Sequence, residues 1–493
     1  MFKKLKSMFS SCFNFYETGT EMETSARRRW RIKKKQVKSG PVTKDKEIEY
    51  LINDRSTPDL VKMVMPPEPY NLLNYSVHQY KGGGFPSDSD EGRAANVYVT
   101  VTNCLNMMRK YSNKPLVRWA GTKDLAVLPM AGTDFNAFYN RKSMQFFFSY
   151  DPVAKVPIFT SESADIVAHE LGHAILDSFR PDTWGVASLE VWSFHEAFAD
   201  LTALLSIMQH DEILKYVLAE TKGNIRMESV MTRLAESMGR AIYNITGGQG
   251  GRPKNHLRST INNFKYVNPG TLPKQAPHNK LAAECHSFGR VFLGAFYDIM
   301  EMMYHENVAQ GKSQLKALKE ARDTLGKYVF KAIMHVPVNV KFYESFAKTM
   351  LWVDHNQPNR PYFEKMREIF LDRNLMKPQI RMLSAPPVDE DGDGIVALGS
   401  QVPMTLSHHI IRAQGQDENP LYDVELVAAK EGAFFYDQNT GSAIDHVSVS
   451  DEDVLSALQD MIVFLHETGA VSDDESTPFE IKDGKLERTH FSW

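Results

Sequence analysis

The centre of the chain carries seven segments whose apolar residues recur at the spacing of an α-helix, and this pattern constrains the fold most strongly. Such helices are amphipathic and need a common core against which to bury their apolar faces. The central part of the chain is therefore expected to form a largely helical lobe. The segments cover residues 163–178, 193–209, 211–220, 228–244, 281–304, 313–334 and 340–352.

The regions on either side differ in character. Upstream, NVYVTVTNCLNMMRKY from Asn96 resembles a strand passing into a helix, and LAVLPMA and MQFFFSY are short apolar runs typical of strands. Downstream, SAPPVDEDGDGIVALGS breaks the pattern, and the rest mixes alternating apolar stretches with one helical segment, VLSALQDMIVFLHETG. A chain of 493 residues also exceeds what one core usually organises.

These patterns predict an α+β fold with several parts. Residues 46–175 are expected to form a β-rich N-terminal lobe that ends in the helix predicted from residue 163. Residues 176–383 are expected to form a helical lobe, residues 384–400 an acidic linker, and residues 401–493 an accessory α+β domain whose partner the sequence does not identify. Residues 1–45 are polar, with a basic run between Arg27 and Lys38, and are expected to form a flexible tail.

Composition places few limits on partners. The formal net charge of −4 does not indicate a nucleic-acid partner. The cysteines, Cys12, Cys104 and Cys285, are too few and too scattered for a disulfide framework or a Cys-based metal site. Polar residues at positions 10, 11, 12 and 14 interrupt the apolar run of a signal peptide, and no stretch is long enough to cross a bilayer. A cytoplasmic location is favoured.

The segment ADIVAHELGHAILD contains the pattern most specific for chemistry. His169 and His173 are four residues apart, so on a helix both imidazoles lie on one face and can bind one ion. Zn²⁺ suits neutral imidazole ligands in a tetrahedral site. Glu170 is rotated to the side, which places its carboxylate beside the ion, where a general base belongs.

A catalytic zinc site usually has three protein ligands, and the third must come from elsewhere. The class with a third His shortly after the second is excluded, because Leu176 and Phe179 occupy the positions of its Gly and His. In SFHEAFADLTALLS, Glu196 and Asp200 share a helical face. Glu196 is the favoured ligand and Asp200 its neighbour that would bind a ligand His N–H; His195 is the rival ligand.

These residues resemble the thermolysin-like metallopeptidases and the related fungalysins, gluzincins in which an HExxH helix is followed by an ExxxD helix bearing the Glu ligand. The segment FNAFYNRKSMQFFFSY is similar to that family's substrate-binding edge strand, with Asn136, Ala137 and Tyr139 in its Asn-Ala-x-aromatic signature. The resemblance extends over roughly residues 95–355. It implies a two-lobed fold with the zinc helix between the lobes.

Two weaker similarities follow downstream. LRST resembles the family's Leu-Arg-Ser segment and CHSFGRVFLGAFYDI its helix with a transition-state histidine, which implies a substrate-binding role for Arg258 and a catalytic role for His286. The chain departs from the family in having His195 before the Glu ligand and no clear Tyr between the two zinc helices. Transition-state stabilisation would then depend more on His286.

The resemblance implies a zinc metalloendopeptidase that hydrolyses peptide bonds of a peptide or protein substrate. Two alternatives stay open: a zinc-stabilised binding module without turnover, against which the intact Glu170 argues, and a zinc aminopeptidase, whose Gly-x-Met-Glu-Asn hallmark is absent. Ca²⁺ is not favoured as a second ion. The loop that begins at Asp389 has Ser400 where a calcium loop needs Glu, and calcium-rich acidic segments are not recognisable after Glu196.

Overall fold

The computed structural model describes most of the chain up to residue 377 and parts of the C-terminal region. The described residues are 47–55, 61–82, 86–112, 114–377, 406–413, 422–429, 433–436, 443–468, 471–472, 479–482 and 485–492. The expected basic tail, the acidic linker and the candidate calcium loop at Asp389 lie outside these residues.

The N-terminal part combines short strands with one long helix, α2 (Asp90–Tyr111). The expected strand at Asn96 is wrong, because the whole run VYVTVT lies inside this helix. Its β-branched residues are buried on all sides, and such burial outweighs their local preference for strands. Ser89 caps the helix by accepting a hydrogen bond from the Gly92 amide at 3.0 Å.

The strands of this part are β1 (Ile48–Leu51), β2 (Val61–Val64), β3 (Asn74–Val77), β4 (Asp124–Leu128), β5 (Ala137–Tyr139), β6 (Ser143–Phe146), β7 (Phe148–Asp151) and β8 (Val156–Phe159). Strands β3, β4 and β6 are parallel, and β5 runs antiparallel to β6. The order in this sheet is β18-β5-β6-β4-β3, so a strand from the far end of the chain, β18 (Phe491–Ser492), completes the edge next to β5.

The central part is helical, as the apolar periodicity predicts. Its helices are α3 (Ala164–Phe179), α4 (Leu189–Ile207), α5 (Asp211–Glu220), α6 (Glu236–Thr246), α7 (Cys285–Ala309), α8 (Gln314–Ile333), α9 (Phe342–His355) and α10 (Phe363–Asp372). One boundary differs from expectation. The segment expected to be helical from residue 228 first forms β9 (Arg233–Leu234), which pairs with β10 (Arg258–Ser259).

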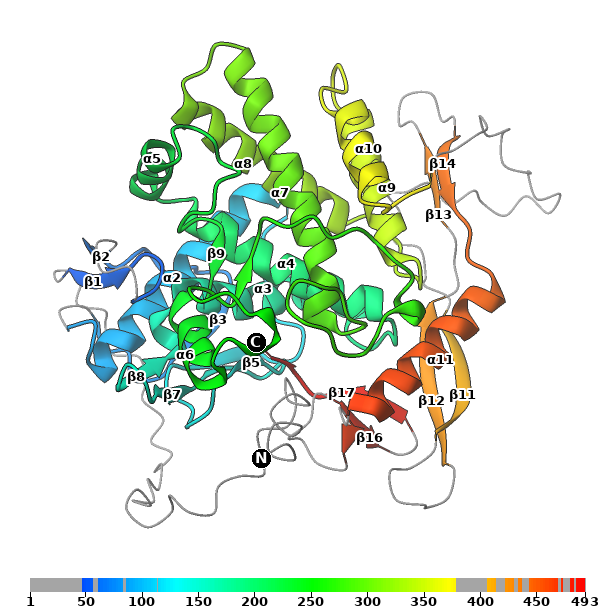
Figure 1. Cartoon of the computed structure of the whole chain (residues 1–493), viewed down its shortest axis with the longest axis horizontal. Helices are drawn as coiled ribbons and strands as arrows, with labels where there is room; N and C mark the ends of the chain where they lie inside the picture. Colours follow the sequence, from blue (N-terminus) through cyan, green and yellow to red (C-terminus); the bar gives the residue numbers. More distant parts are fainter. Residues whose placement is uncertain are drawn as a thin grey trace.

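The C-terminal part is a mixed α/β unit that packs against the helical part (Figure 1). Helix α11 packs against β11 and β12 of a sheet with the order β11-β12-β17-β16-β15. The elements are β11 (Leu406–Ala413), β12 (Tyr422–Ala429), β13 (Ala433–Tyr436), β14 (Ala443–Val447), α11 (Asp451–Thr468), β15 (Val471–Ser472), β16 (Phe479–Lys482), β17 (Lys485–Arg488) and β18. The α+β class expected from the sequence is confirmed.

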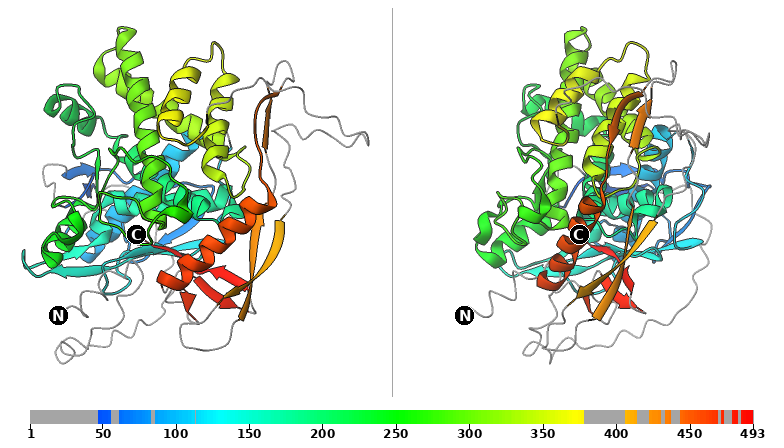
Figure 2. Two further views of the ribbon diagram at one scale, coloured as in Figure 1. Left: turned by 45° about the vertical axis from the view of Figure 1, so that its right-hand side comes forward. Right: turned by 90° about the vertical axis from the view of Figure 1, so that its right-hand side faces the viewer.

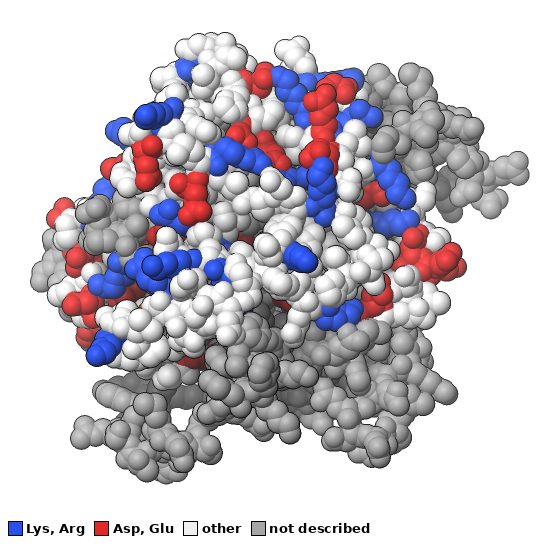
Figure 3. Space-filling model, viewed as in Figure 1, with Lys and Arg blue, Asp and Glu red and all other residues white. Residues whose placement is uncertain are grey.

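Buried apolar side chains form one continuous cluster that runs from Ile48 through the central helices to Phe491. The largest packing partner of α3 is α4, and α4 in turn packs on α7. Figure 2 shows these helices between the small strands and the outer helices α8 to α10. Acidic and basic side chains are interspersed over the face in Figure 3. Among the described helices, none is both long and apolar enough to span a membrane.

Candidate metal centre and peptide-binding edge

Helix α3 presents His169, Glu170 and His173 to the interior of the molecule. All three side chains are fully buried. Because the histidines are one helical turn apart, their Nε2 atoms face each other at 3.1 Å. The apolar residues that surround the motif on this helix supply the burial, since Ile166, Val167 and their neighbours pack into the core.

Helix α4 adds Glu196 to the two histidines. Its carboxylate oxygens lie 3.4 Å from the His169 Nε2 atom and 3.7 Å from the His173 Nε2 atom. Neither oxygen accepts a hydrogen bond from the described residues. Bonds of about 2.1 Å to a tetrahedral ion hold neighbouring ligand atoms about 3.4 Å apart, so the separations found here fit a Zn²⁺ ion.

Asp200 lies one turn after Glu196 and holds the first histidine in place. The His169 Nδ1 atom is 2.8 Å from the Asp200 carboxylate, which leaves the Nε2 lone pair directed at the cluster. The Arg258 guanidinium donates two hydrogen bonds to the same carboxylate, at 3.0 and 2.8 Å. Burial alone would raise the pKa of Asp200, but Arg258 and His169 outweigh it and hold the pKa well below its usual value.

The rival ligand His195 faces away from the cluster. Its Nε2 atom is 2.8 Å from the Thr183 hydroxyl, on the segment between α3 and α4. Among the described residues, His169, His173 and Glu196 form one of two groups that could hold a metal ion, here called the candidate metal-ligating group. Arg258, predicted to bind substrate, is buried and contacts Asp200.

Glu170 lies beside this group with both carboxylate oxygens buried and without a hydrogen-bond partner in the described part of the chain. Burial raises its pKa well above the usual value, and the negative charge of Glu196 adds to this rise. A buried carboxylate without a partner is costly, and a cation bound by its neighbours would offset that cost. The spacing of the ligand atoms is one indication that the site is suited to a positive ion, and the buried Glu170 carboxylate is a second.

His286 lies in the first turn of helix α7, with its Nε2 atom 3.4 Å from the Glu196 carboxylate. Its Nδ1 atom is hydrogen-bonded to Glu284, which also caps the helix by accepting from the His286 and Ser287 amides. Burial alone would lower the pKa of His286, but the negative charges around it, led by Glu196, raise it well above the usual value.

Two glycines allow the three helices to approach closely enough for these contacts. A Cβ atom on Gly172 would lie 2.8 Å from the Ala199 Cα atom, and one on Gly289 would lie 2.7 Å from the Ser193 carbonyl oxygen. Real Cβ atoms essentially never come that close to other atoms. Gly172 thus sets the distance from α3 to α4, and Gly289 the distance from α4 to α7.

Three of the predicted substrate-binding residues, Asn136, Ala137 and Tyr139, lie on or next to β5, which packs against α3. Asn136 precedes the strand, and its side-chain oxygen accepts a hydrogen bond from the Ala137 amide at 2.9 Å. Tyr139 is fully buried and donates to Asp177 at 2.9 Å, so only its backbone is available to a neighbouring strand. The edge of β5 away from β6 is paired with β18, at Phe491 and Ser492.

Sequence reasoning missed several residues of the site. Glu284 could not be found from local pattern, because Glu is not among the residues preferred at a helix N-cap. Cys285 is buried and belongs, with Glu196 and His286, to a second group of clustered ligand atoms in the described residues. Arg488 and Phe491 come from the far C-terminal segment, for which the sequence carries no local signal.

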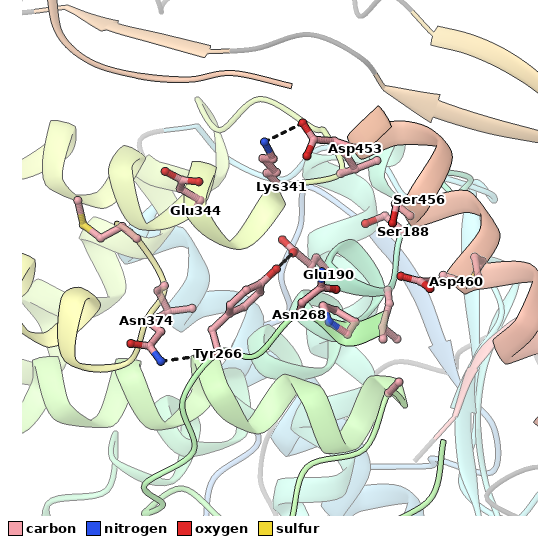
Figure 4. A pocket seen from close by; sticks show the side chains of 18 of the residues that line it. Ser188, Glu190, Tyr266, Asn268, Lys341, Glu344, Asn374, Asp453, Ser456 and Asp460 are labelled. Atoms are coloured by element: carbon pink, nitrogen blue, oxygen red, sulfur yellow. Dashed lines mark hydrogen bonds and ion pairs between the residues drawn. The ribbon is translucent and has the colours of Figure 1, made fainter. Parts of the chain in front are cut away.

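A cavity of about 380 Å³ lies apart from this site, between the helical part and the C-terminal unit. Figure 4 shows Glu190 and Tyr266 within it, joined by a hydrogen bond of 2.7 Å, and the Lys341–Asp453 ion pair at its rim. None of the clustered residues that could hold a metal ion lines it.

Sequence comparison finds no protein-family model and no curated protein that matches the chain.

Proposed function

We propose that this protein is a zinc-dependent endopeptidase with a two-lobed, thermolysin-like organisation. The observation that carries the proposal is the position of Glu170. Among the described residues its carboxylate has no hydrogen-bond partner, and it is buried against a group of two histidines and one glutamate whose spacing fits zinc. Two imidazoles and two carboxylates are buried together here, and Glu170 has no hydrogen-bond partner among the described residues, which is costly on a helix surface that serves no ligand.

His169, His173 and Glu196 would hold the ion, which when bound supplies a Lewis acid that polarises a carbonyl group and acidifies water. Glu170 then acts as the general base. Its carboxylate removes a proton from the attacking water and passes it to the nitrogen of the leaving amine, so the carboxylate is regenerated in each cycle. A covalent intermediate with the chain is not required.

His286 would stabilise the transition state by donating a hydrogen bond to the carbonyl oxygen as negative charge develops on it. One such donor contributes about 2.7–4 kcal/mol in comparable sites. Glu284 orients the ring, because its carboxylate binds Nδ1 and leaves Nε2 directed toward the site. The arrangement supports a role for His286 as a donor rather than as a metal ligand.

Strand β5 would bind the substrate by backbone pairing. The edge next to Ala137 and Phe138 is available to an extended peptide once β18 is absent, and backbone pairing does not depend on either end of the substrate. This favours cleavage within a chain over removal of single terminal residues.

Cleavage of an unbiased peptide library by the wild type and by Glu170→Gln tests the proposal. Loss of a general base lowers the rate by about 10²- to 10⁴-fold. We expect cleavage by the wild type, little by the variant, and equal zinc in both. A Glu170→Gln variant that binds zinc and cleaves at the wild-type rate would overturn the mechanism.

A further inference from the structure

The chain delivers its own C-terminal segment to the edge of β5. Strand β17 belongs to the sheet of the C-terminal unit, and after residues 489 and 490 the chain continues directly into β18. There Phe491 pairs with Tyr139 and Ser492 with Phe138, in antiparallel register. Figures 1 and 2 show this segment leaving the C-terminal unit and ending in the middle of the molecule, beside β5.

The Phe491 side chain covers the candidate metal-ligating group. Its ring stacks on that of His173, with centroids 4.5 Å apart and an interplanar angle of 10°, and on that of His195 at 4.4 Å. Trp184 contacts the same ring edge-on at 5.3 Å. Phe491 is only 1% exposed, so this pocket encloses an aromatic side chain completely.

The neighbouring residues of the segment add further contacts. The Arg488 guanidinium lies 4.3 Å from the Trp192 ring centroid, and the Arg488 carbonyl oxygen accepts a hydrogen bond from the Trp184 indole at 3.3 Å. His490 is buried, and its ring lies 5.0 Å from that of Phe138 on β5. Backbone pairing combined with pockets for successive side chains is the pattern of a bound extended peptide.

We propose that residues 488–492 are an internal ligand of the peptide-binding cleft. The segment occupies the edge of β5 and the pocket of Phe491, and it must leave before a substrate can bind. This inference rests on the proposed function, because it identifies the cleft as a substrate site. It also assigns the substrate class: extended peptides with an aromatic side chain in the pocket formed by His173, His195 and Trp184.

Covalent attachment makes the segment an effective competitor. A ligand joined to its site by a short linker acts at an effective concentration of the order of millimolar. A free peptide therefore binds only to the fraction of molecules whose cleft is open, and its apparent affinity falls in proportion. Substitutions that weaken the segment should increase that fraction.

The test is the binding of a fluorescent peptide with the sequence of residues 485–493 to full-length protein that carries Glu170→Gln, which prevents turnover. It is measured by anisotropy for three further variants in this background: Phe491→Asp, Arg488→Ser, and the control Leu455→Asp. Leu455 is 48% exposed on α11, in the same C-terminal unit but outside the cleft. Thermal unfolding verifies that each protein is folded.

We expect the peptide to bind the Phe491→Asp and Arg488→Ser proteins about tenfold or more tightly than the parent or the Leu455→Asp control, because more clefts are open. A peptide with Asp in place of the Phe should not bind. The rate of amide hydrogen exchange at Phe138 and Tyr139 should rise in the Phe491→Asp and Arg488→Ser proteins and not in the parent or the Leu455→Asp control. Equal binding to all four folded proteins, or binding to none, would overturn the proposal.

Activity is scored separately with Glu170 intact. Faster library cleavage by Phe491→Asp than by the wild type agrees with both proposals. If the peptide binds as expected but no protein cleaves, the internal ligand stands and the peptidase proposal fails. If the wild type cleaves and the segment variants change neither binding nor rate, the peptidase proposal stands and the internal ligand fails.

Discussion

Asp200 accepts hydrogen bonds from two buried partners, His169 and Arg258, and so connects a proposed metal ligand to the β9–β10 strand pair that carries Arg258. Asp200→Asn removes the charge that pairs with Arg258 and offers an amide where His169 needs an acceptor. Loss of such a supporting carboxylate typically weakens metal binding by about 10- to 100-fold. Competition with a chromophoric chelator measures the zinc affinity of the wild type and of Asp200→Asn.

The matched control for Asp200→Asn is Asp182→Asn. Asp182 pairs with Arg180 in a partly exposed position, where an ion pair contributes about 0–1 kcal/mol. Zinc affinity should be unchanged in this variant. Equal affinity of the wild type and Asp200→Asn would show that the carboxylate does not orient His169.

His210 gives the molecule a pH dependence unrelated to the metal site. It precedes α5 and is largely buried, and burial lowers its pKa to about 4; the nearby Lys62 adds to this effect and Glu212 opposes it. Below the unfolded value of 6.5 the unfolded chain binds a proton that the folded protein does not, so stability is lost as the pH falls toward 4. A shift of this size corresponds to about 3 kcal/mol.

Unfolding by denaturant at pH 7 and pH 5 measures this contribution. In the His210→Asn variant the N-cap position of α5 carries Asn, which suits a helix N-cap and is not protonated in this pH range. This variant should therefore lose less stability between the two pH values than the wild type. An identical loss in both proteins would mean that His210 is not buried in its neutral form.

Residue-level chemistry was predictable where ligands share one helix. The four-residue spacing of His169 and His173 determines their common face, and the same reasoning connects Glu196 with Asp200. Helical spacing could not predict the contacts of His195, because its partner Thr183 lies on the segment between α3 and α4. Nor could it place Tyr139, whose hydroxyl binds Asp177 within the core.

At the scale of elements, the site depends on how closely α3, α4 and α7 pack. Gly172→Ala places a methyl group 2.8 Å from the Ala199 Cα atom and 3.1 Å from Thr202, so α4 must move. Overpacking of this kind typically costs about 1–3 kcal/mol. Since α4 carries Glu196, we expect lower stability and weaker zinc binding together, measured by calorimetry.

Gly185→Ala is the control for this substitution, because a Cβ atom at Gly185 meets nothing within 4 Å. Its stability should stay within about 0.5 kcal/mol of the wild type. If Gly172→Ala behaved like Gly185→Ala, the close approach of α3 and α4 would not determine the geometry of the site.

Helical periodicity was a reliable guide to the elements of the central part, because amphipathic helices bury one face and expose the other. It failed at α2, where valines and threonines that favour strands are buried in a helix on all sides. It also failed just before α6, where residues 233 and 234 pair with β10 rather than extend the helix.

The whole molecule is organised around contacts between distant parts of the chain. Strand β18 pairs with β5 across some 350 positions of sequence, and Phe491 joins the same core as Ile48. A strand of two residues carries no alternation, so no sequence pattern could reveal this pairing or its register. The role of the C-terminal unit therefore emerges only from the structure.

In the proposed site, His169, His173 and Glu196 hold a zinc ion. The most direct measurement is the zinc content of purified full-length protein, compared between the wild type, Glu196→Ala and His195→Gln. We predict an equimolar amount of zinc in the wild type and in His195→Gln, whose side chain faces Thr183, and a large loss in Glu196→Ala. No zinc in the wild type, or loss in His195→Gln with retention in Glu196→Ala, would contradict the account.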